Sequence, residues 1–308
     1  MKLNENIKFS VITPCFNSEK YIESAVISVL NQEGDFDIEY YIIDGGSEDR
    51  TISIVERYKR LIDSGRFRIN CKNIQIKIIS EKDNGMYDAL VKGFKLITGN
   101  IVSYINSDDF YLPNAFKTLK RVFEKYPKIS WLTGNATISN EDGIISNICT
   151  PYFYYNKFIR MGLYNGKILP FIQQESTFFK RELLKEIKYI ELKKLKYAGD
   201  SYIWVCFARK EPLFIILALL ASWRRHPNNL SSDLDKYRYE MQNFTEKINI
   251  NEEDKKILLY CQKRLKDPIS TYGKNNNRII WWEPKINNWM GNLSYEVNCN
   301  VLKGEVYC

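Results

Sequence analysis

The stretch that decides the fold is residues 9–49, which read FSVITPCFNSEKYIESAVISVLNQEGDFDIEYYIIDGGSED. It opens on a β-branched and aromatic run, Phe9 to Thr13, which predicts a buried strand. Polar Asn17-Ser18 then precedes apolar residues at helical spacing, and Ile38 to Ile43 again predicts a strand. Strand, helix and strand in this order predict parallel strands joined by a right-handed crossover.

The alternation of strand and helix continues to about residue 105. Alternating isoleucines at 74–78 predict a third strand, and residues 86–97 predict a third helix that Gly99 closes as its C′ residue. Residues 101–105 predict a fourth strand, so we expect an α/β fold with a mostly parallel, Rossmann-like central sheet flanked by helices. Further on, helices are predicted at 110–126, 182–191, 200–209 and 250–266, and a strand at 131–138.

The composition is that of a folded, mildly basic protein. Among 308 residues, 21 Tyr, 16 Phe and 6 Trp exclude a disordered chain, and the formal net charge of +8 suits an anionic ligand or surface. Seven scattered cysteines without a Cys-x-x-Cys pair indicate reduced thiols in a cytoplasm. The polar start and a longest apolar run of only Leu213 to Ala221 predict neither a signal peptide nor a membrane span.

Three polar motifs follow predicted strands, at the edge where open α/β sheets bind ligands. They are Thr13-Pro-Cys-Phe-Asn17, Asp44-Gly-Gly-Ser-Glu-Asp49 and Asn106-Ser-Asp-Asp109. Each alone is typical of a turn, but three at neighbouring strand ends predict one shared polar site. The adjacent carboxylates Asp108 and Asp109 repel each other, which favours a Mg²⁺ or Mn²⁺ ion held together with substrate phosphates. The absence of Walker and Gly-x-Gly-x-x-Gly motifs disfavours P-loop and dinucleotide-binding proteins.

A fourth motif, Glu81-Lys-Asp-Asn-Gly-Met-Tyr-Asp-Ala89, lies between the second and third of these. In this order and spacing the four motifs resemble a family 2 glycosyltransferase of the bacterial glycan-biosynthesis type. The resemblance covers roughly residues 8–230 and is strongest over 8–112. It implies a GT-A fold and transfer of a sugar from a nucleotide-activated donor, with inversion at the anomeric carbon.

The resemblance also implies a donor site. Phe16 would flank the nucleotide base and Asp44 would accept a hydrogen bond from it, although core packing is an equal alternative for Phe16. Asp109, with Asp108, would hold the metal. The expected donor-binding residues are Thr13, Pro14, Phe16, Asn17, Asp44, Asn84, Gly85, Asp88 and Asp108.

Two positions depart from the pattern of the family. Val91 stands where relatives often have Asn, and its side chain can neither donate nor accept a hydrogen bond. Cys15 replaces a common Thr or Ser, and we expect it to be an inert, small buried residue.

The acceptor half is expected after residue 110. Ala198-Gly-Asp-Ser-Tyr-Ile-Trp204 matches the acidic residue that heads an aromatic-rich helix in the family, so Asp200 is the predicted general base. The alternative is that Asp200 only caps this helix. Gln174 and Glu175 fall where relatives place acceptor-site residues, or they belong to a polar strand edge.

The only histidine, His226, follows Trp223-Arg-Arg225 at a place that lies near the diphosphate in the family. We expect it to contact the metal or a phosphate, with a structural role as the alternative. Arg224 and Arg225 would neutralise phosphate charge, or they are solvated surface residues.

Residues 227–308 are expected to form a mainly helical C-terminal extension. Before it, residues 1–226 form the GT-A domain, with a nucleotide-sugar half at 1–109 and an acceptor half at 110–226. Aromatic and basic residues of the extension would lie at a bilayer interface, or pack onto the main domain. They are Trp281, Trp282, Trp289, Lys274, Arg278 and Lys285.

Together these features predict a metal-dependent inverting glycosyltransferase that uses Mn²⁺ or Mg²⁺. A nucleoside-diphosphate sugar, with UDP favoured, is the expected donor, and a glycan or lipid-linked saccharide hydroxyl in cell-surface polysaccharide assembly is the expected acceptor. The enzyme is expected to be cytoplasmic, with possible peripheral association at the inner membrane face and no nucleic-acid partner. The alternatives are a sugar-nucleotide-binding or scaffold protein without catalysis and a nucleotidyltransferase, which lacks support because residues 13–17 contain no Gly or basic residue.

Overall fold

The computed structural model describes most of the chain. The residues it describes are 7–151, 153–227, 229, 233–264, 279–283 and 286–291. The predicted basic residues Lys274, Arg278 and Lys285, and the side chains of Trp281 and Trp282, lie outside the described part.

The first half alternates strictly between strand and helix, as its apolar pattern predicts. Each strand is a β-branched or aromatic run, and each helix has its apolar residues on one face. The elements are β1 (Lys8–Cys15), α1 (Ile22–Leu30), β2 (Gly34–Asp44), α2 (Thr51–Asp63), β3 (Cys71–Ser80), α3 (Met86–Phe94) and β4 (Ile101–Tyr104).

The second half mixes short strands and helices. The apolar run that begins at Leu213, too short to span a membrane, forms the long strand β9. The elements up to the extension are β5 (Phe110–Tyr111), α4 (Ala115–Lys125), β6 (Trp131–Ser139), β7 (Ile145–Cys149), α5 (Asn156–Arg160), β8 (Thr177–Lys180), the 3₁₀ helix η1 (Arg181–Glu186), α6 (Tyr189–Leu192), α7 (Gly199–Ala208) and β9 (Phe214–Arg224).

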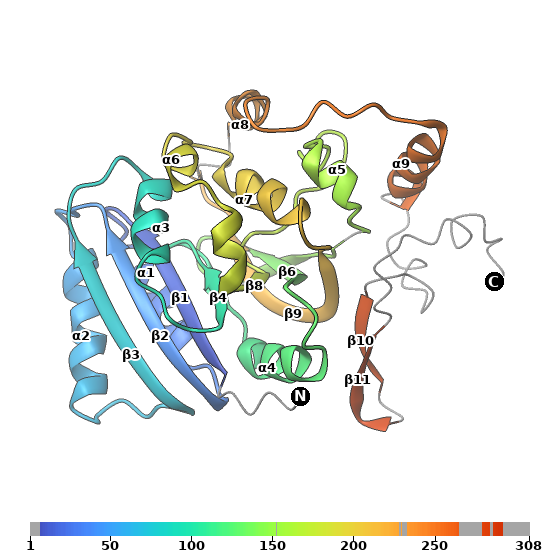
Figure 1. Cartoon of the computed structure of the whole chain (residues 1–308). Helices are drawn as coiled ribbons and strands as arrows, with labels where there is room; N and C mark the ends of the chain where they lie inside the picture. The colour runs from blue at the N-terminus through green and yellow to red at the C-terminus, as the bar shows by residue number, and fades with distance from the viewer. Residues whose placement is uncertain are drawn as a thin grey trace.

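One sheet runs through the described residues, in the order β11-β10-β9-β6-β8-β4-β1-β2-β3. The predicted parallel arrangement is confirmed for β1 to β4, where β1 pairs in parallel with both β2 and β4. In the second half β8 runs antiparallel between β4 and β6, whereas β6 and β9 are parallel. The carboxyl ends of β1, β2 and β4 therefore lie at the same edge of the sheet. The carboxyl end of β9 lies next to them, because it pairs with β5 directly after β4 (Figure 1).

Helices cover both faces of this sheet. One apolar core lies between the sheet and α3, α5 and α7, and a second lies between the sheet and α1, α2 and α4. Figure 1 shows α6 and α7 above the sheet and α4 below it. The α/β fold with a helix-flanked sheet is confirmed.

The extension contributes both helices and strands. Its described elements are α8 (Leu234–Met241), α9 (Glu252–Arg264), β10 (Ile279–Glu283) and β11 (Asn288–Gly291). β10 pairs in parallel with β9, so the extension adds to the edge of the sheet. Trp289 is buried, and its carbonyl accepts hydrogen bonds from Lys125 Nζ and Tyr126 Oη. For this tryptophan, packing onto the main domain is the observed arrangement.

The expectation that Gly99 closes α3 as a left-handed residue was wrong. α3 already ends at Phe94, and Gly99 is absent from the residues with positive φ. Its N–H donates to Ser10 Oγ at 2.9 Å, and a Cβ at this position would lie 2.5 Å from that oxygen and 2.6 Å from the carbonyl oxygen of Lys8. Glycine is needed here because β1 approaches too closely for any side chain.

We therefore predict that Gly99→Ala destabilises the protein. The added methyl group must displace the backbone of β1, the strand in the middle of the parallel half, at a cost of about 1–3 kcal/mol. Thermal unfolding followed by circular dichroism will show a lower midpoint. Lys95→Ala, an exposed change in the same connection, will leave the midpoint unchanged, and an equal midpoint for the two variants would contradict the close approach.

Candidate active site

The turn after β1 presents an exposed aromatic ring. Phe16 is 60% exposed, which rules out core packing and leaves its ring free to contact a ligand. Asn17, at φ 47°, turns the chain sharply behind it, and its Oδ1 accepts a hydrogen bond from the backbone of Glu48. Thr13 is fully buried, and its hydroxyl lies 2.9 Å from Tyr40 Oη. Thr13 therefore supports the strand end, and Phe16 is the residue that reaches outward.

Asp44, at the end of β2, is held by its own surroundings. One carboxylate oxygen accepts from Ser80 Oγ at 2.6 Å and from the backbone N–H of Ser47 at 3.0 Å. The other accepts from Ser47 Oγ at 2.5 Å and lies 3.8 Å from Cys15 Sγ. Burial and the Asp44 charge raise the pKa of Cys15 far above its usual range, so this thiol is inert, as expected. The fixed carboxylate explains the tight turn after β2, and its contact with a base remains a prediction.

The fourth motif, residues 81–89, lies at the start of α3. Asp88 is buried in the first turn, where one oxygen accepts from the backbone and side chain of Asn84 and the other pairs with Lys193 Nζ at 2.6 Å. Gly85 has φ 114°, and a Cβ there would meet nothing within 4 Å. Val91 is fully buried in the core, so its departure from the family pattern is absorbed by apolar packing.

The two adjacent aspartates point in different directions. Asp108 is partly exposed, and its Oδ2 lies 2.8 Å from His226 Nε2. Asp109 is buried, and its Oδ1 accepts from the backbone N–H of Arg224 at 2.8 Å. Burial and the charge of Asp108 raise the pKa of Asp109 well above its usual range. A cation bound nearby would lower the pKa of Asp109 instead, because it favours the charged carboxylate.

The donor set around Asp108 fits a divalent ion. Carboxylate oxygens with an imidazole suit Mn²⁺, and Mg²⁺ or Mn²⁺ with a nucleotide needs few protein ligands because phosphates and water supply the rest. Within the described residues, no three His, Cys, Asp or Glu side chains form a ready-made metal cage. The pair Asp108 and His226 is therefore consistent with an ion that binds together with its phosphate ligand.

Two residues near His226 were missed from the sequence. Asn229 Nδ2 lies 3.3 Å from Asp108 Oδ2 and 3.1 Å from His226 Nε2, and the ring of Tyr21 stacks on the imidazole with centroids 4.9 Å apart. Asn229 follows His226 by three residues, so a short-range search of the sequence would have found it. Tyr21 lies in the first quarter of the chain, and only the fold brings it here.

Arg224 is buried, so the solvated-surface alternative is wrong for this residue. It is 5% exposed, and its guanidinium donates to the carbonyls of Asp108 and Glu141 and to Ser24 Oγ at 2.6–2.7 Å. The same group lies over the rings of Tyr21 and Phe110. Arg224 joins the end of β9 to the turn after β4, whereas Arg225 is exposed.

The predicted base lies on a helix buried on nearly all sides. Every residue of α7 is buried except Asp200, which is partly exposed in the first turn. Ala198, not Asp200, is the N-cap residue, so the capping alternative was wrong. Burial raises the pKa of Asp200 to about 6, within the range of a base that works near neutral pH.

Glu175 is a buried carboxyl just before β8. It is 4% exposed, its Oε1 has no hydrogen-bond partner among the described residues, and burial with the charges of Asp200 and Asp108 raises its pKa to about 7. Gln174 is also buried, and its amide donates to the carbonyl of Tyr104 at 2.6 Å. Neither residue lies within a strand, since β8 begins at Thr177, and their contact with an acceptor remains a prediction.

Comparison with known proteins agrees with this architecture. The family model described as "Glycosyl transferase family 2" matches residues 10–188. The chain belongs to this family. It is a glycosyltransferase.

Relatives by sequence support the same assignment. An uncharacterized glycosyltransferase of Haemophilus influenzae is 26% identical over 96% of this chain and 86% of its own length. The GalNAc(5)-diNAcBac-PP-undecaprenol beta-1,3-glucosyltransferase of Campylobacter jejuni is 26% identical over 68% of this chain. The chain covers 62% of that protein, and 18% of a chondroitin synthase of Escherichia coli that is 30% identical over the matched part.

Solved structures show the same fold. TarS of S. aureus, in complex with UDP-GlcNAc, has a TM-score of 0.55 at 17% identity, over 86% of this chain and 76% of that one. The mannosyltransferase PcManGT of Pyrobaculum calidifontis, in complex with GDP-Man and Mn²⁺, has a TM-score of 0.54 at 15% identity, over 85% of this chain and 70% of that one. The GT-A fold of the glycosyltransferase is thereby established.

We predict that Arg224→Ala destabilises the enzyme while Arg225→Ala does not. Removing the Arg224 guanidinium leaves buried carbonyls without donors and costs about 2–4 kcal/mol. Thermal unfolding of the two variants gives a matched comparison, since the arginines are adjacent and only one is buried. Equal midpoints would show that Arg224 does not hold the site together.

Proposed function

We propose that this glycosyltransferase is metal-dependent and inverting, and that it moves a sugar from a nucleoside-diphosphate donor, UDP in the first place, to a hydroxyl of a glycan or lipid-linked saccharide. The observation that carries the proposal is that Asp108 Oδ2 lies 2.8 Å from His226 Nε2, where the turn after β4 meets the end of β9. In the proposed site the donor phosphate lies against this pair, and Asp200 takes the proton of the acceptor. The walls of this site come from the carboxyl ends of parallel strands, where ligands of such sheets bind.

On the donor side, the exposed ring of Phe16 would pack against the nucleotide base. Asp44, Asn84, Gly85 and Asp88 would line the nucleoside, with Thr13, Pro14 and Asn17 shaping the first turn. Gly85 supports this assignment because its backbone is open to close approach.

The diphosphate would lie against Asp108. Asp108, Asp109 and His226 would hold a Mn²⁺ or Mg²⁺ ion, and the approach of His226 to Asp108 supports this set. When bound, the ion neutralises charge on the leaving diphosphate. The mannosyltransferase PcManGT, which has the same fold, forms a complex with GDP-Man and Mn²⁺, and this supports the proposal.

On the acceptor side, Asp200 would take the proton of the attacking hydroxyl. Its position at the edge of a buried helix, and its raised pKa, support this role. Glu175 and Gln174 would border the acceptor, and the unpartnered Oε1 of Glu175 suits an acceptor hydroxyl.

The names of two relatives support the proposed acceptor class. The Campylobacter jejuni protein is named for an undecaprenol diphosphate-linked saccharide, and another relative is named for minor teichoic acid biosynthesis. In the described part of the chain, no helix has both the length and the apolar character to cross a bilayer. We propose that the enzyme works in the cytoplasm, at the inner face of the membrane where such acceptors are displayed.

We predict that UDP, together with Mn²⁺, raises the thermal midpoint of the protein. A ligand at one hundred times its Kd stabilises the native state by about 2.7 kcal/mol, which is easily measured. GDP, CMP and dTDP are measured in the same way, each with and without Mn²⁺. In the Asp108→Asn and His226→Ala variants, the part of the midpoint shift that depends on Mn²⁺ should be lost. A shift of equal size without metal would contradict metal dependence, and no shift with any nucleotide would favour the non-catalytic alternative.

We predict that Asp200→Asn reduces sugar transfer by at least about 10²-fold while nucleotide binding stays intact, because only proton removal is lost. UDP released from UDP-glucose and UDP-N-acetylglucosamine reports transfer to added saccharides or to water. In the wild type the transfer rate should rise with pH through about pH 6, where Asp200 loses its proton. The Glu175→Gln variant should show the same rise of rate with pH. Asp63→Asn, on the exposed end of α2, is the control. A fall in nucleotide affinity equal to the fall in rate would refute the assignment.

A further inference from the structure

Helix α8 of the C-terminal extension contacts the predicted base directly. Tyr237, in the middle of α8, is 7% exposed, and its hydroxyl donates to Asp200 Oδ1 over 3.0 Å. The Tyr237 hydroxyl also lies 3.0 Å from Ser201 Oγ, which is its second hydrogen-bond partner. A donor fixed on one carboxylate oxygen leaves the other oxygen to accept a proton.

A second residue of α8 fixes the start of α7. The carboxylate of Glu240 accepts hydrogen bonds from three successive backbone N–H groups, those of Lys196, Tyr197 and Ala198, at 2.6–2.8 Å. Ala198 is the N-cap residue of α7 and has no side-chain acceptor of its own. Glu240 thus supplies from α8 the anionic cap that the α7 sequence lacks.

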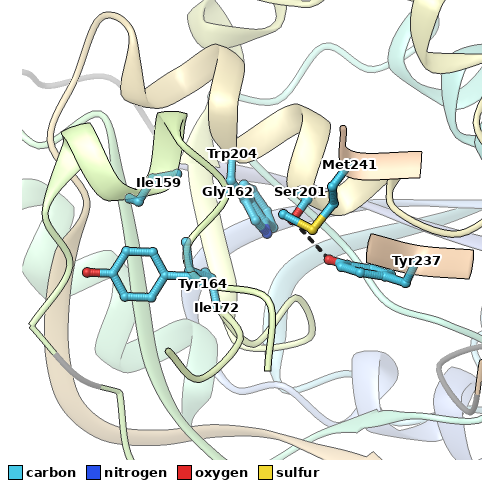
Figure 2. A pocket seen from close by; sticks show the side chains of 8 residues that line it. All are labelled: Ile159, Gly162, Tyr164, Ile172, Ser201, Trp204, Tyr237 and Met241. Atoms are coloured by element: carbon cyan, nitrogen blue, oxygen red, sulfur yellow. Dashed lines mark hydrogen bonds between the residues drawn. The ribbon is translucent and has the colours of Figure 1, made fainter. Parts of the chain in front are cut away.

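Packing holds α8 in this position. Tyr237 and Met241 form a small apolar cluster with Ala198, and Phe171 meets the ring of Tyr237 edge-on at 5.3 Å. Figure 2 shows the hydroxyl of Tyr237 bonded to Ser201, with the side chain of Met241 close by, at a cavity of about 10 Å³ that Trp204 also lines. A cavity of this size is close to the smallest that holds one water.

We propose that α8 positions the general base of this enzyme: Tyr237 orients the carboxylate of Asp200, and Glu240 fixes the turn that carries it. Both are positioning residues, because each acts through Asp200 or its helix. The inference deepens the proposed function and rests on Asp200 being the base. It gives part of the extension, residues 233–241, a role in the reaction.

The groups around Asp200 determine whether a substitution at Tyr237 or Glu240 raises or lowers the pKa of Asp200. Tyr237 donates to the charged carboxylate and so favours it, whereas the charge of Glu240 disfavours it. Tyr87 of α3 accepts from the backbone N–H of Asp200 at 3.3 Å, and Tyr104 of β4 and Glu175 also face this carboxyl. Losing the Tyr237 hydroxyl should therefore raise the pKa of Asp200, and neutralising Glu240 should lower it.

The test is a ¹³C NMR titration of the full-length protein with labelled aspartate carboxyls, the Asp200 signal being identified by its loss in Asp200→Asn. In Tyr237→Phe the titration midpoint of Asp200, about 6 in the wild type, should rise by about one pH unit. In Glu240→Gln it should move downward. The pH at which the rate of UDP release from UDP-glucose rises should shift in the same directions. Below the titration midpoint, the Tyr237→Phe variant should therefore release UDP up to about tenfold more slowly than the wild type.

Tyr239→Phe is the matched control, since Tyr239 lies on the same helix and is 72% exposed. It should leave both the midpoint of Asp200 and the pH profile unchanged. An unchanged midpoint in folded Tyr237→Phe would overturn the positioning role while the proposed function stands. A normal transfer rate in Asp200→Asn would overturn the proposed function instead, whatever the titration shows.

Discussion

The arrangement of the site depends on one buried arginine. Arg224 closes β9, and its backbone N–H binds the carboxylate of Asp109 while its guanidinium binds the carbonyl of Asp108. These bonds fix the turn after β4 to the end of β9, although the two segments are far apart in the chain. Because the guanidinium is planar and always charged, it satisfies several carbonyls at once in a place where lysine could satisfy fewer. The relative position of the two aspartates and His226 follows from this connection.

The same region concentrates acidic groups away from water. Burial raises the pKa of Asp109, Glu175 and Asp200, and the like charges of their neighbours add to the effect for Asp109 and Glu175. Such an arrangement costs stability, which proteins tolerate where the shifted groups are used. In a glycosyltransferase the cost is understandable, since a base must hold its proton loosely near neutral pH.

The C-terminal extension contacts both the proposed active site and the central sheet. By sequence it is a polar segment after the last recognised motif, yet α8 caps α7 and binds Asp200, and β10 lengthens the sheet next to β9. The fold of the family supplies the sheet and the carboxylates. The extension supplies groups that orient one of them.

The sequence by itself determined the parallel half of the sheet, because apolar runs of period 2 and 3.6 alternate there and leave one arrangement for the strand ends. Motif spacing also predicts Asp44, Asp108 and Asp200 as site residues, without knowledge of their contacts. Only the tertiary structure decided that Asp109 turns inward, that Gly99 serves a close approach rather than a helix end, and that Tyr237 reaches Asp200. These depend on contacts between residues far apart in the chain, and local periodicity carries no information about such pairs.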